Sequence, residues 1–189
     1  KRYPEFLKFC VCGLFYQAGI AVVITLSAVY AQLVMKFTTA QTITLILVVN
    51  ITAAIGAFVF GYVQDRLGHK KTLALTILLW IIMGVMAAFS HGPVSFWIAA
   101  NIAGIAMGSS QSAGRAVVAV FAPAGELAQF YSAWNVAVWG ANVLGPITYG
   151  TVTWLTSGDQ RTAILVTTLF FVIGLLILRR VHLPSKTVC

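Results

Sequence analysis

The sequence predicts an all-α membrane protein that crosses the bilayer six times. Of its 189 residues, 60% are hydrophobic and only 8% are charged, whereas soluble domains average about 25% charged residues. The charged residues are also clustered, so that they separate long apolar segments. Because a water-soluble chain of this composition would expose large apolar patches and aggregate, lipid is the expected solvent.

Six apolar segments are long enough to span a bilayer as helices. The first has about 27 uncharged residues between Lys8 and Lys36, which suffice for one tilted span. Short polar or proline-containing stretches separate the others. We expect Pro93 to stand at the start of the fourth helix, and the fifth helix to kink at Gly145-Pro146. The other five predicted helices cover residues 41–64, 72–89, 94–121, 127–155 and 162–178.

Positive charge is distributed unevenly over the two sides that six spans define. An even number of spans puts both termini on one side, together with the loop between the second and third helices. The opposite side carries only Lys36 and Arg161. The positive-inside rule therefore predicts cytoplasmic termini in a multi-pass protein, which we expect in a bacterial inner (plasma) membrane. The cations on the predicted cytoplasmic side are Lys1, Arg2, Lys8, Arg66, Lys70, Lys71, Arg179, Arg180 and Lys186.

Composition and cysteine spacing argue against nucleic acids, metals and cofactors as ligands. The net charge of +8 would suit nucleic acid, but the basic residues flank apolar segments, so anionic lipid headgroups are the expected partner. Cys10 and Cys12 lie two apart in an apolar helix, and we interpret them as packing residues. No signal peptide or initiator Met is visible, so we expect the chain to begin inside a longer protein.

The densest run of charge extends from Gly61 to Lys71, between the second and third predicted helices. Asp65 would lie at the C-terminal end of a helix, where a carboxylate is unfavourable unless a positive group answers it. We expect Arg66 or the N-terminus of a neighbouring helix to do so. Gly61 would allow close backbone approach, and Gly68 would adopt the positive φ of a tight turn.

Two stretches carry a family resemblance. The charged run resembles the signature of the major facilitator superfamily, Gly-x-x-x-Asp-Arg-x-Gly-x-Lys-Lys, which lies between the second and third helices of a six-helix half. From Phe6 onward the chain is also similar to the C-terminal half of the vacuole-effluxer-like permeases, which include the autophagy-related amino acid effluxer. The second similarity rests on Gly108-Ser-Ser-Gln111-Ser-Ala-Gly-Arg115, Pro123, Glu126 and Phe130-Tyr131, and the first on Gly61, Asp65, Arg66, Gly68, Lys70 and Lys71.

The resemblance implies that residues 1–189 form a single six-helix domain, the C-terminal half of a twelve-helix secondary transporter. The substrate cavity would lie between two halves, and small solutes, amino acids among them, would cross by alternating access. The partner would be the missing N-terminal half or a second copy of this chain, which would make a homodimer. One departure from the family is that no acidic residue lies near Tyr16-Gln17, which argues against proton or cation coupling through the first helix.

A weak internal echo relates residues 61–68 to residues 150–161. Glycines recur after the second and the fifth helix, and each is followed by a charged segment. This suits two inverted three-helix repeats, a layout known in transporters. Chance explains the echo equally well, because glycine is common in membrane helices.

Polar residues recur at helical spacing inside two apolar segments. Unsatisfied polar groups are costly in lipid, so such residues are functional candidates, and spacings of three and four place them on one face of a helix. The stripe on the fourth helix comprises Asn101, Gly104, Gly108, Gln111 and Arg115, and that on the fifth Ser132, Asn135, Trp139, Asn142 and Pro146.

Two interpretations of these stripes are open. Gly104 and Gly108 have the spacing that lets helices approach closely. The alternative is a water-lined cavity, in which Arg115 would bind a substrate carboxylate; otherwise Arg115 pairs with Glu126 or a lipid headgroup. In the superfamily the first and fourth helices of each half line the cavity. The predicted cavity residues are Tyr16, Gln17, Gln111, Arg115, Asn135, Trp139 and Asn142.

An intramembrane protease and a non-transporting membrane subunit are the alternatives to transport. A rhomboid-like protease would use a serine on the fourth helix, where Ser109, Ser110 and Ser112 lie, and a histidine on the sixth. The sixth segment has no histidine within its span, and His182 follows it, so no base would activate the serine and we do not expect an enzyme. A membrane subunit that only binds a partner stays open.

Overall fold

The computed structural model describes residues 3–184, which form six α-helices. Three cations of the predicted cytoplasmic side, Lys1, Arg2 and Lys186, lie outside these residues. The all-α, six-helix prediction is confirmed, with helix ends that move by a few residues. The fifth helix continues through Pro146 as one helix. The helices are α1 (Pro4–Leu33), α2 (Thr39–Leu67), α3 (His69–Ala88), α4 (Pro93–Phe121), α5 (Leu127–Leu155) and α6 (Gln160–Arg180).

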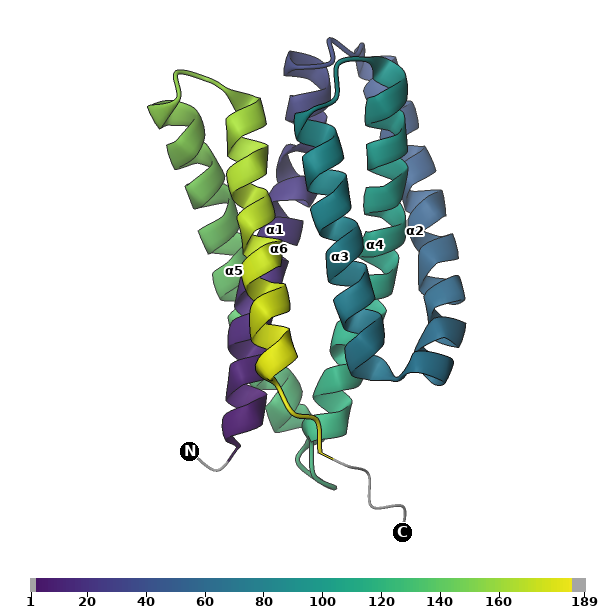
Figure 1. Cartoon of the computed structure of the whole chain (residues 1–189), viewed down its shortest axis with the longest axis vertical. Coiled ribbons are helices and arrows are strands. Elements are labelled where there is room, and N and C mark those ends of the chain that lie inside the picture. The colour runs from purple at the N-terminus through teal and green to yellow at the C-terminus, as the bar shows by residue number, and fades with distance from the viewer. Residues whose placement is uncertain (1–2, 185–189) are drawn as a thin grey trace.

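The helices differ in how apolar they are. Within the described residues, α1, α2, α3 and α6 are long and apolar enough to cross a membrane. The remaining helices, α4 and α5, have 29 residues each and run alongside the others in one bundle (Figure 1). Because about 20 helical residues span the hydrocarbon core, their length suffices. What sets α4 and α5 apart is therefore the polar stripes that they carry.

The helix arrangement relates two inverted halves of the chain. α4 packs against α2 and α3, while α1 packs against α5 and α6, and α3 lies beside α6. Exchanging α1 with α4, α2 with α5 and α3 with α6 leaves this pattern unchanged. Figure 1 shows that α1 and α4 run in opposite directions. The fold thus consists of the two inverted three-helix repeats expected from the sequence.

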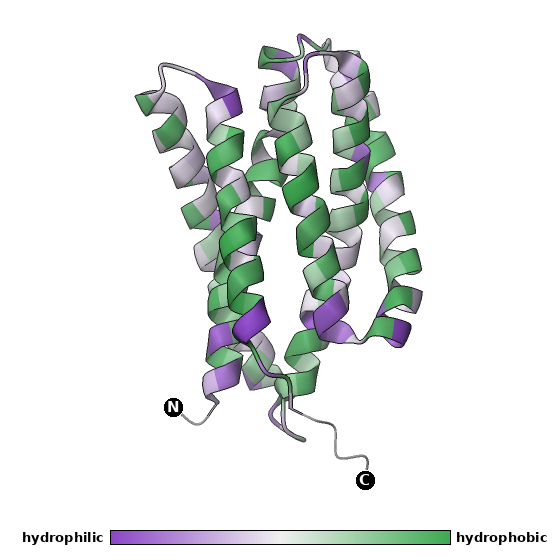
Figure 2. Cartoon of the chain, in the orientation of Figure 1, coloured by the Kyte–Doolittle hydropathy of each residue, from purple (hydrophilic) through white to green (hydrophobic). Residues whose placement is uncertain are grey.

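One end of the bundle, called the terminal end below, holds the start of α1, the end of α6 and the junction between α2 and α3 (Figure 1). Lys70 Nζ donates to the carbonyl oxygens of Arg179, at 3.1 Å, and Val181, at 2.5 Å. The charged run and the end of α6 therefore lie on the same side, as the charge distribution predicts. Hydrophilic residues gather at the helix ends and apolar residues along their lengths (Figure 2).

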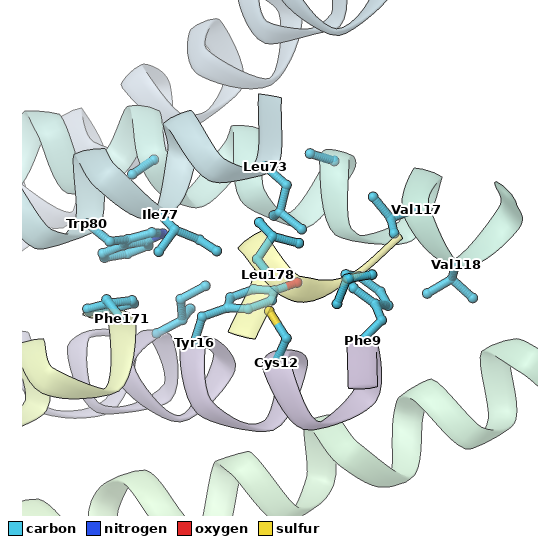
Figure 3. Packing of buried hydrophobic residues seen from close by; sticks show 14 of the residues in the cluster. Phe9, Cys12, Tyr16, Leu73, Ile77, Trp80, Val117, Val118, Phe171 and Leu178 are labelled. Atoms are coloured by element: carbon cyan, nitrogen blue, oxygen red, sulfur yellow. The ribbon is translucent and has the colours of Figure 1, made fainter. Parts of the chain in front are cut away.

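The centre of the core is an aromatic stack between α3 and α6. Trp80 and Phe171 are stacked with ring centroids 5.3 Å apart and an interplanar angle of 6°, and Figure 3 shows the two rings face to face. Trp80 Nε1 donates to Ser110 Oγ on α4 at 3.2 Å. Gly19 on α1 leaves room for the stack, because a Cβ there would lie 2.5 Å from the Phe171 ring.

Glycines bring two parallel helix pairs into backbone contact. A Cβ on Gly108 of α4 would collide with the Ala53 carbonyl of α2, and one on Gly56 would lie 2.6 Å from the Ile105 oxygen. The inverted counterpart is Gly145 of α5, where a Cβ would collide with the Ala18 carbonyl of α1. Gly104 likewise lies against Thr52 of α2. Such close approach strengthens helix packing where lipid supplies no hydrophobic drive.

Two cations close the ends of α3 and α6 reciprocally. Lys70, in the first turn of α3, donates to the last carbonyls of α6. Arg161, in the first turn of α6, donates to the Ser90 carbonyl just beyond α3 at 2.7 Å. A cation at a helix C-terminus pairs with unsatisfied carbonyls and with the negative end of the dipole. These bonds tie the two antiparallel helices together at both ends.

The junction between α2 and α3 is shorter than predicted. We expected α2 to end at Gln64 and α3 to begin at Thr72, but Gly68 alone separates the helices. Gly68 has the expected positive φ, 80°, so the chain turns within a single residue. Helical hydrogen bonding continues up to the turn on both sides, because Gly68 N–H donates to the Gln64 carbonyl and Thr72 N–H to the Gly68 carbonyl.

Candidate functional site

The C-terminal part of the α4 stripe is at least partly exposed. Arg115 is exposed and Gln111 is half-buried. Among the described residues no carboxylate lies within salt-bridge distance of Arg115. Glu126, one of its expected partners, instead accepts a hydrogen bond from the Tyr3 hydroxyl at 3.3 Å. The guanidinium is therefore available to a ligand, a headgroup or a partner.

α2 and α4 diverge toward the terminal end (Figure 1). The two helices are in contact around Gly104 and Gly108. Seven residues further along α4, Arg115 continues the same face. On α2, a Cβ at Gly61 would meet no described atom within 4 Å. The expected close backbone approach at Gly61 is thus not made within the described part of this chain.

The predicted residues of the α5 stripe share one exposed face of the helix. Asn135, Trp139 and Asn142 are all exposed, Trp139 to 72%. The neighbouring positions Trp134 and Ala141 are buried, with Trp134 against Gly13 of α1. Helix geometry therefore brings the three predicted residues together on one face. They are not brought together with Gln111 and Arg115, because α4 and α5 make little contact.

Tyr16 and Gln17 lie in the core, not on the exposed face where a cavity was expected. Tyr16 is 0% and Gln17 is 5% exposed. Two glycines make room for the tyrosine: a Cβ at Gly114 would lie 2.6 Å from its hydroxyl, and one at Gly174 would lie 3.1 Å from its Cβ. Figure 3 shows Tyr16 among the packed side chains. These glycines come from α4 and α6, so the burial depends on contacts far away in sequence.

A cavity that the sequence did not reveal lies mainly between α1, α2, α3 and α4, and one residue each of α5 and α6 also lines it. Its volume is about 240 Å³, and its lining is largely apolar. Two polar groups at its walls are satisfied, since the Tyr30 hydroxyl donates to the Ala87 carbonyl at 2.9 Å and the Asn50 amide to the Ile46 carbonyl at 2.8 Å. None of the seven predicted residues lines it. Such a cavity leaves no sequence signal, because core-facing and lipid-facing positions are both apolar.

The carboxylate of the charged run has no ion-pair partner within the described part of the chain. Asp65 is exposed, and among residues 3–184 it forms no ion pair, although Arg66 follows it directly. A carboxylate at the C-terminal end of a helix is disfavoured by the dipole. Together with the open face at Gly61, this leaves the terminal end of α2 available for further contacts.

Similar proteins were found by sequence and by structure. The family described as "Vacuole effluxer Atg22 like" matches residues 1–188. YxiO of Bacillus subtilis (strain 168), an uncharacterised transporter of the major facilitator (MFS) type, is 26% identical over 187 residues, which are 99% of this chain and 43% of YxiO.

Two solved structures share the fold. The fucose:proton symporter FucP of E. coli has a TM-score of 0.81 and 18% identity over 97% of this chain and 44% of its own. The xylose transporter XylE of E. coli, in an inward-open conformation, has a TM-score of 0.77 and 20% identity over 94% of this chain and 47% of its own. The chain thus spans less than half the length of the relatives that it matches. It is an integral membrane protein with the fold of a major facilitator half, and it belongs to the Atg22-like vacuole effluxer family.

Proposed function

We propose that this chain is the C-terminal half of a twelve-helix secondary transporter, which moves a small solute by alternating access. The observation that carries the proposal is that Arg115, on a helix of a membrane bundle, is exposed and forms no ion pair among residues 3–184. A charge facing lipid at this position would be costly, whereas a water-filled cavity would hydrate it. In such transporters one half rocks against the other around a central site.

The second half is proposed to belong to the same, longer polypeptide. Relatives in sequence and in fold are more than twice as long as the stretch that they share with this chain. The open surface around Gly61 and Asp65, and the exposed stripe of α5, offer contacts for that half. A second copy of this chain is the alternative partner.

Arg115 is proposed to bind a carboxylate of the solute, with Gln111 beside it as a hydrogen-bonding group. A guanidinium suits a carboxylate because it donates two parallel hydrogen bonds. Amino acids are therefore the first class of solute to test. FucP and XylE are described as fucose and xylose transporters, and neutral sugars give a matched class that offers no carboxylate.

The terminal end is proposed to face the cytoplasm, in a bacterial inner (plasma) membrane. Arg66, Lys71, Arg179 and Arg180 lie at this end, against Lys36 and Arg161 at the other. The positive-inside rule relates such an excess to the cytoplasmic side. A reporter that is active only in the cytoplasm should therefore be active when it is fused after the last residue.

The test is solute uptake by the full-length protein in proteoliposomes. Uptake of a labelled amino acid is expected to fall by at least about tenfold in Arg115→Ala, which loses a charge-assisted pair of roughly 1.5–3 kcal/mol. Arg115→Lys, which keeps the charge but not the paired geometry, should retain part of it. Exposed Lys36→Ala at the opposite end is the control.

Three outcomes would contradict the proposal. Unchanged uptake in Arg115→Ala would remove this residue from the site. Transport of sugars but no amino acids would overturn the assigned solute class. Partner binding without any transport would favour a membrane subunit that only binds.

A further inference from the structure

The outward faces of α3 and α6 each carry an apolar stripe that ends in a cation. On α3 the exposed residues recur at spacings of three and four, and on α6 they do the same, which places each set on one face. The buried face of α3 meanwhile holds Trp80 in the core. The stripes are Lys71, Leu75, Leu78, Ile82 and Val85 on α3, and Leu169, Ile173, Leu176 and Arg180 on α6.

The two terminal cations lie at the same end of neighbouring helices. Lys70 donates to the carbonyls of Arg179 and Val181. Lys71 follows Lys70 in the chain and Arg180 lies between the two acceptors, so both cations are held in the same region. Figure 2 shows the hydrophilic ends of α3 and α6 next to each other, with apolar stretches above them. Lys71, Arg179 and Arg180 are exposed and form no ion pair among the described residues.

The start of α3 has unanswered positive character. Its first turn contains His69, Lys70 and Lys71 and no acidic residue, and within the described part of the chain no side chain caps it. Cations at a helix N-terminus are unfavourable, whereas an anion there is stabilised by free N–H groups and by the dipole. Lys70 is occupied by the end of α6, so Lys71 is the cation left for an anion at this place.

We propose that the outward face of α3 and α6 binds an anionic phospholipid of the leaflet at the terminal end. Its phosphate lies between Lys71 and Arg180, and its acyl chains follow the two apolar stripes. At the opposite end Arg161 is bonded to the Ser90 carbonyl, and no other cation lies on the two stripes. The site therefore belongs to one leaflet only, and a cationic rim on an apolar face is complementary to an amphiphilic anion.

The experiment compares lipids retained by the purified protein. The protein is reconstituted with equal amounts of phosphatidylglycerol and phosphatidylcholine, and retained lipids are counted by native mass spectrometry. The unaltered protein should prefer phosphatidylglycerol. In Lys71→Ala with Arg180→Ala this preference should fall about 25-fold, since each cation near the membrane surface gives roughly a fivefold preference. Lys71→Arg with Arg180→Lys should preserve it.

A charge-matched control removes two cations from the same end but away from the stripes. Lys8→Ala with Arg66→Ala should leave the preference nearly unchanged. An equal loss in both pairs would mean a general charge effect and would overturn the site, as would equal retention of the two lipids. Displacement of the lipid by millimolar glycerophosphate would also overturn it, because the acyl chains would then contribute nothing.

A second measurement does not depend on a variant. Phosphatidylglycerol with a photoreactive diazirine in one acyl chain should label peptides from 71–85 and 169–180 of the unaltered protein. Label confined instead to α2 or α5 would contradict the proposal.

Discussion

The α3–α6 pair and the stripes on α4 and α5 differ in whether their polar groups find partners within the described part of the chain. In the α3–α6 pair, the Trp80 N–H donates to Ser110 of α4, and Lys70 and Arg161 each donate to carbonyls at the end of the other helix. On α4 and α5, Arg115 and the exposed asparagines and tryptophan form no ion pair or aromatic contact among the described residues. The polar groups between α3 and α6 are therefore satisfied within residues 3–184, whereas those on the exposed faces of α4 and α5 are not.

This difference suggests a division of work between the two regions. Apolar outer faces and internal contacts fit α3 and α6 for a lipid boundary. An exposed charge and exposed amides on membrane helices need water, a ligand or a partner to be tolerated. The comparison can be tested by changing chemically matched residues in the two regions.

The largest effect is expected from two tryptophans in the two regions. Trp80→Ala should lower the free energy of unfolding in detergent by about 3–5 kcal/mol, because it empties the stacked core. Trp139→Ala, at a site 72% exposed, should change it by less than about 0.5 kcal/mol. Thermal or denaturant unfolding followed by circular dichroism measures both. Equal losses would mean that Trp139 is part of the folded core.

Two glycines give the next contrast. Gly108→Ala should destabilise by about 1–3 kcal/mol, because the new Cβ collides with the Ala53 carbonyl and helices α2 and α4 must move apart. Gly61→Ala meets no described atom within 4 Å and should be neutral or slightly stabilising through helix propensity. If both variants unfold alike, the tight α2–α4 contact is not made.

The reciprocal caps should give smaller and similar effects. Lys70→Ala and Arg161→Ala are each expected to cost about 1 kcal/mol, as each leaves helix carbonyls without a cation. Lys36→Ala, which removes an exposed cation, is the control. A cost at only one of the two positions would break the proposed symmetry between the ends of α3 and α6.

The smallest effect concerns pH. Asp159 is the N-cap residue of α6. The Thr162 hydroxyl and the N–H of Arg161 donate to its carboxylate, and they lower the pKa of this carboxyl from the usual value of about 3.8. A carboxyl whose folded pKa is depressed stabilises the protein above its unfolded pKa and loses this contribution as pH falls. Between pH 5 and 2, the free energy of unfolding should therefore fall less steeply in Asp159→Asn than in the unaltered protein. An identical pH dependence would exclude this cap from stability.

Much of the fold could be predicted from the sequence, because helix limits and turns are local. The apolar segments gave six helices, Pro93 starts α4, and Gly68 has its positive φ. The prediction of a loop after Gln64 is wrong. Charged residues are as common in helix ends as in loops, so the charged run could not distinguish the two. Gly68 alone turns the chain there.

The arrangement of the candidate site could be predicted only in part. Spacing along one helix places Asn135, Trp139 and Asn142 on one face. The burial of Tyr16 depends on Gly114 and Gly174, which come from other helices. In a membrane protein the inward and outward faces are both apolar, so spacing alone does not say which face is covered.

The most direct test of the account is the accessibility of single cysteines in the full-length protein in its membrane. The native cysteines are replaced by serine, and one cysteine is placed at Asn142 or at Leu78. We expect a membrane-impermeant, water-soluble maleimide to label Asn142→Cys in at least one transport state and to leave Leu78→Cys unmodified. Labelling of Leu78→Cys but not of Asn142→Cys would mean that α3 faces water and α5 faces lipid, which would contradict the assignment of the two sides.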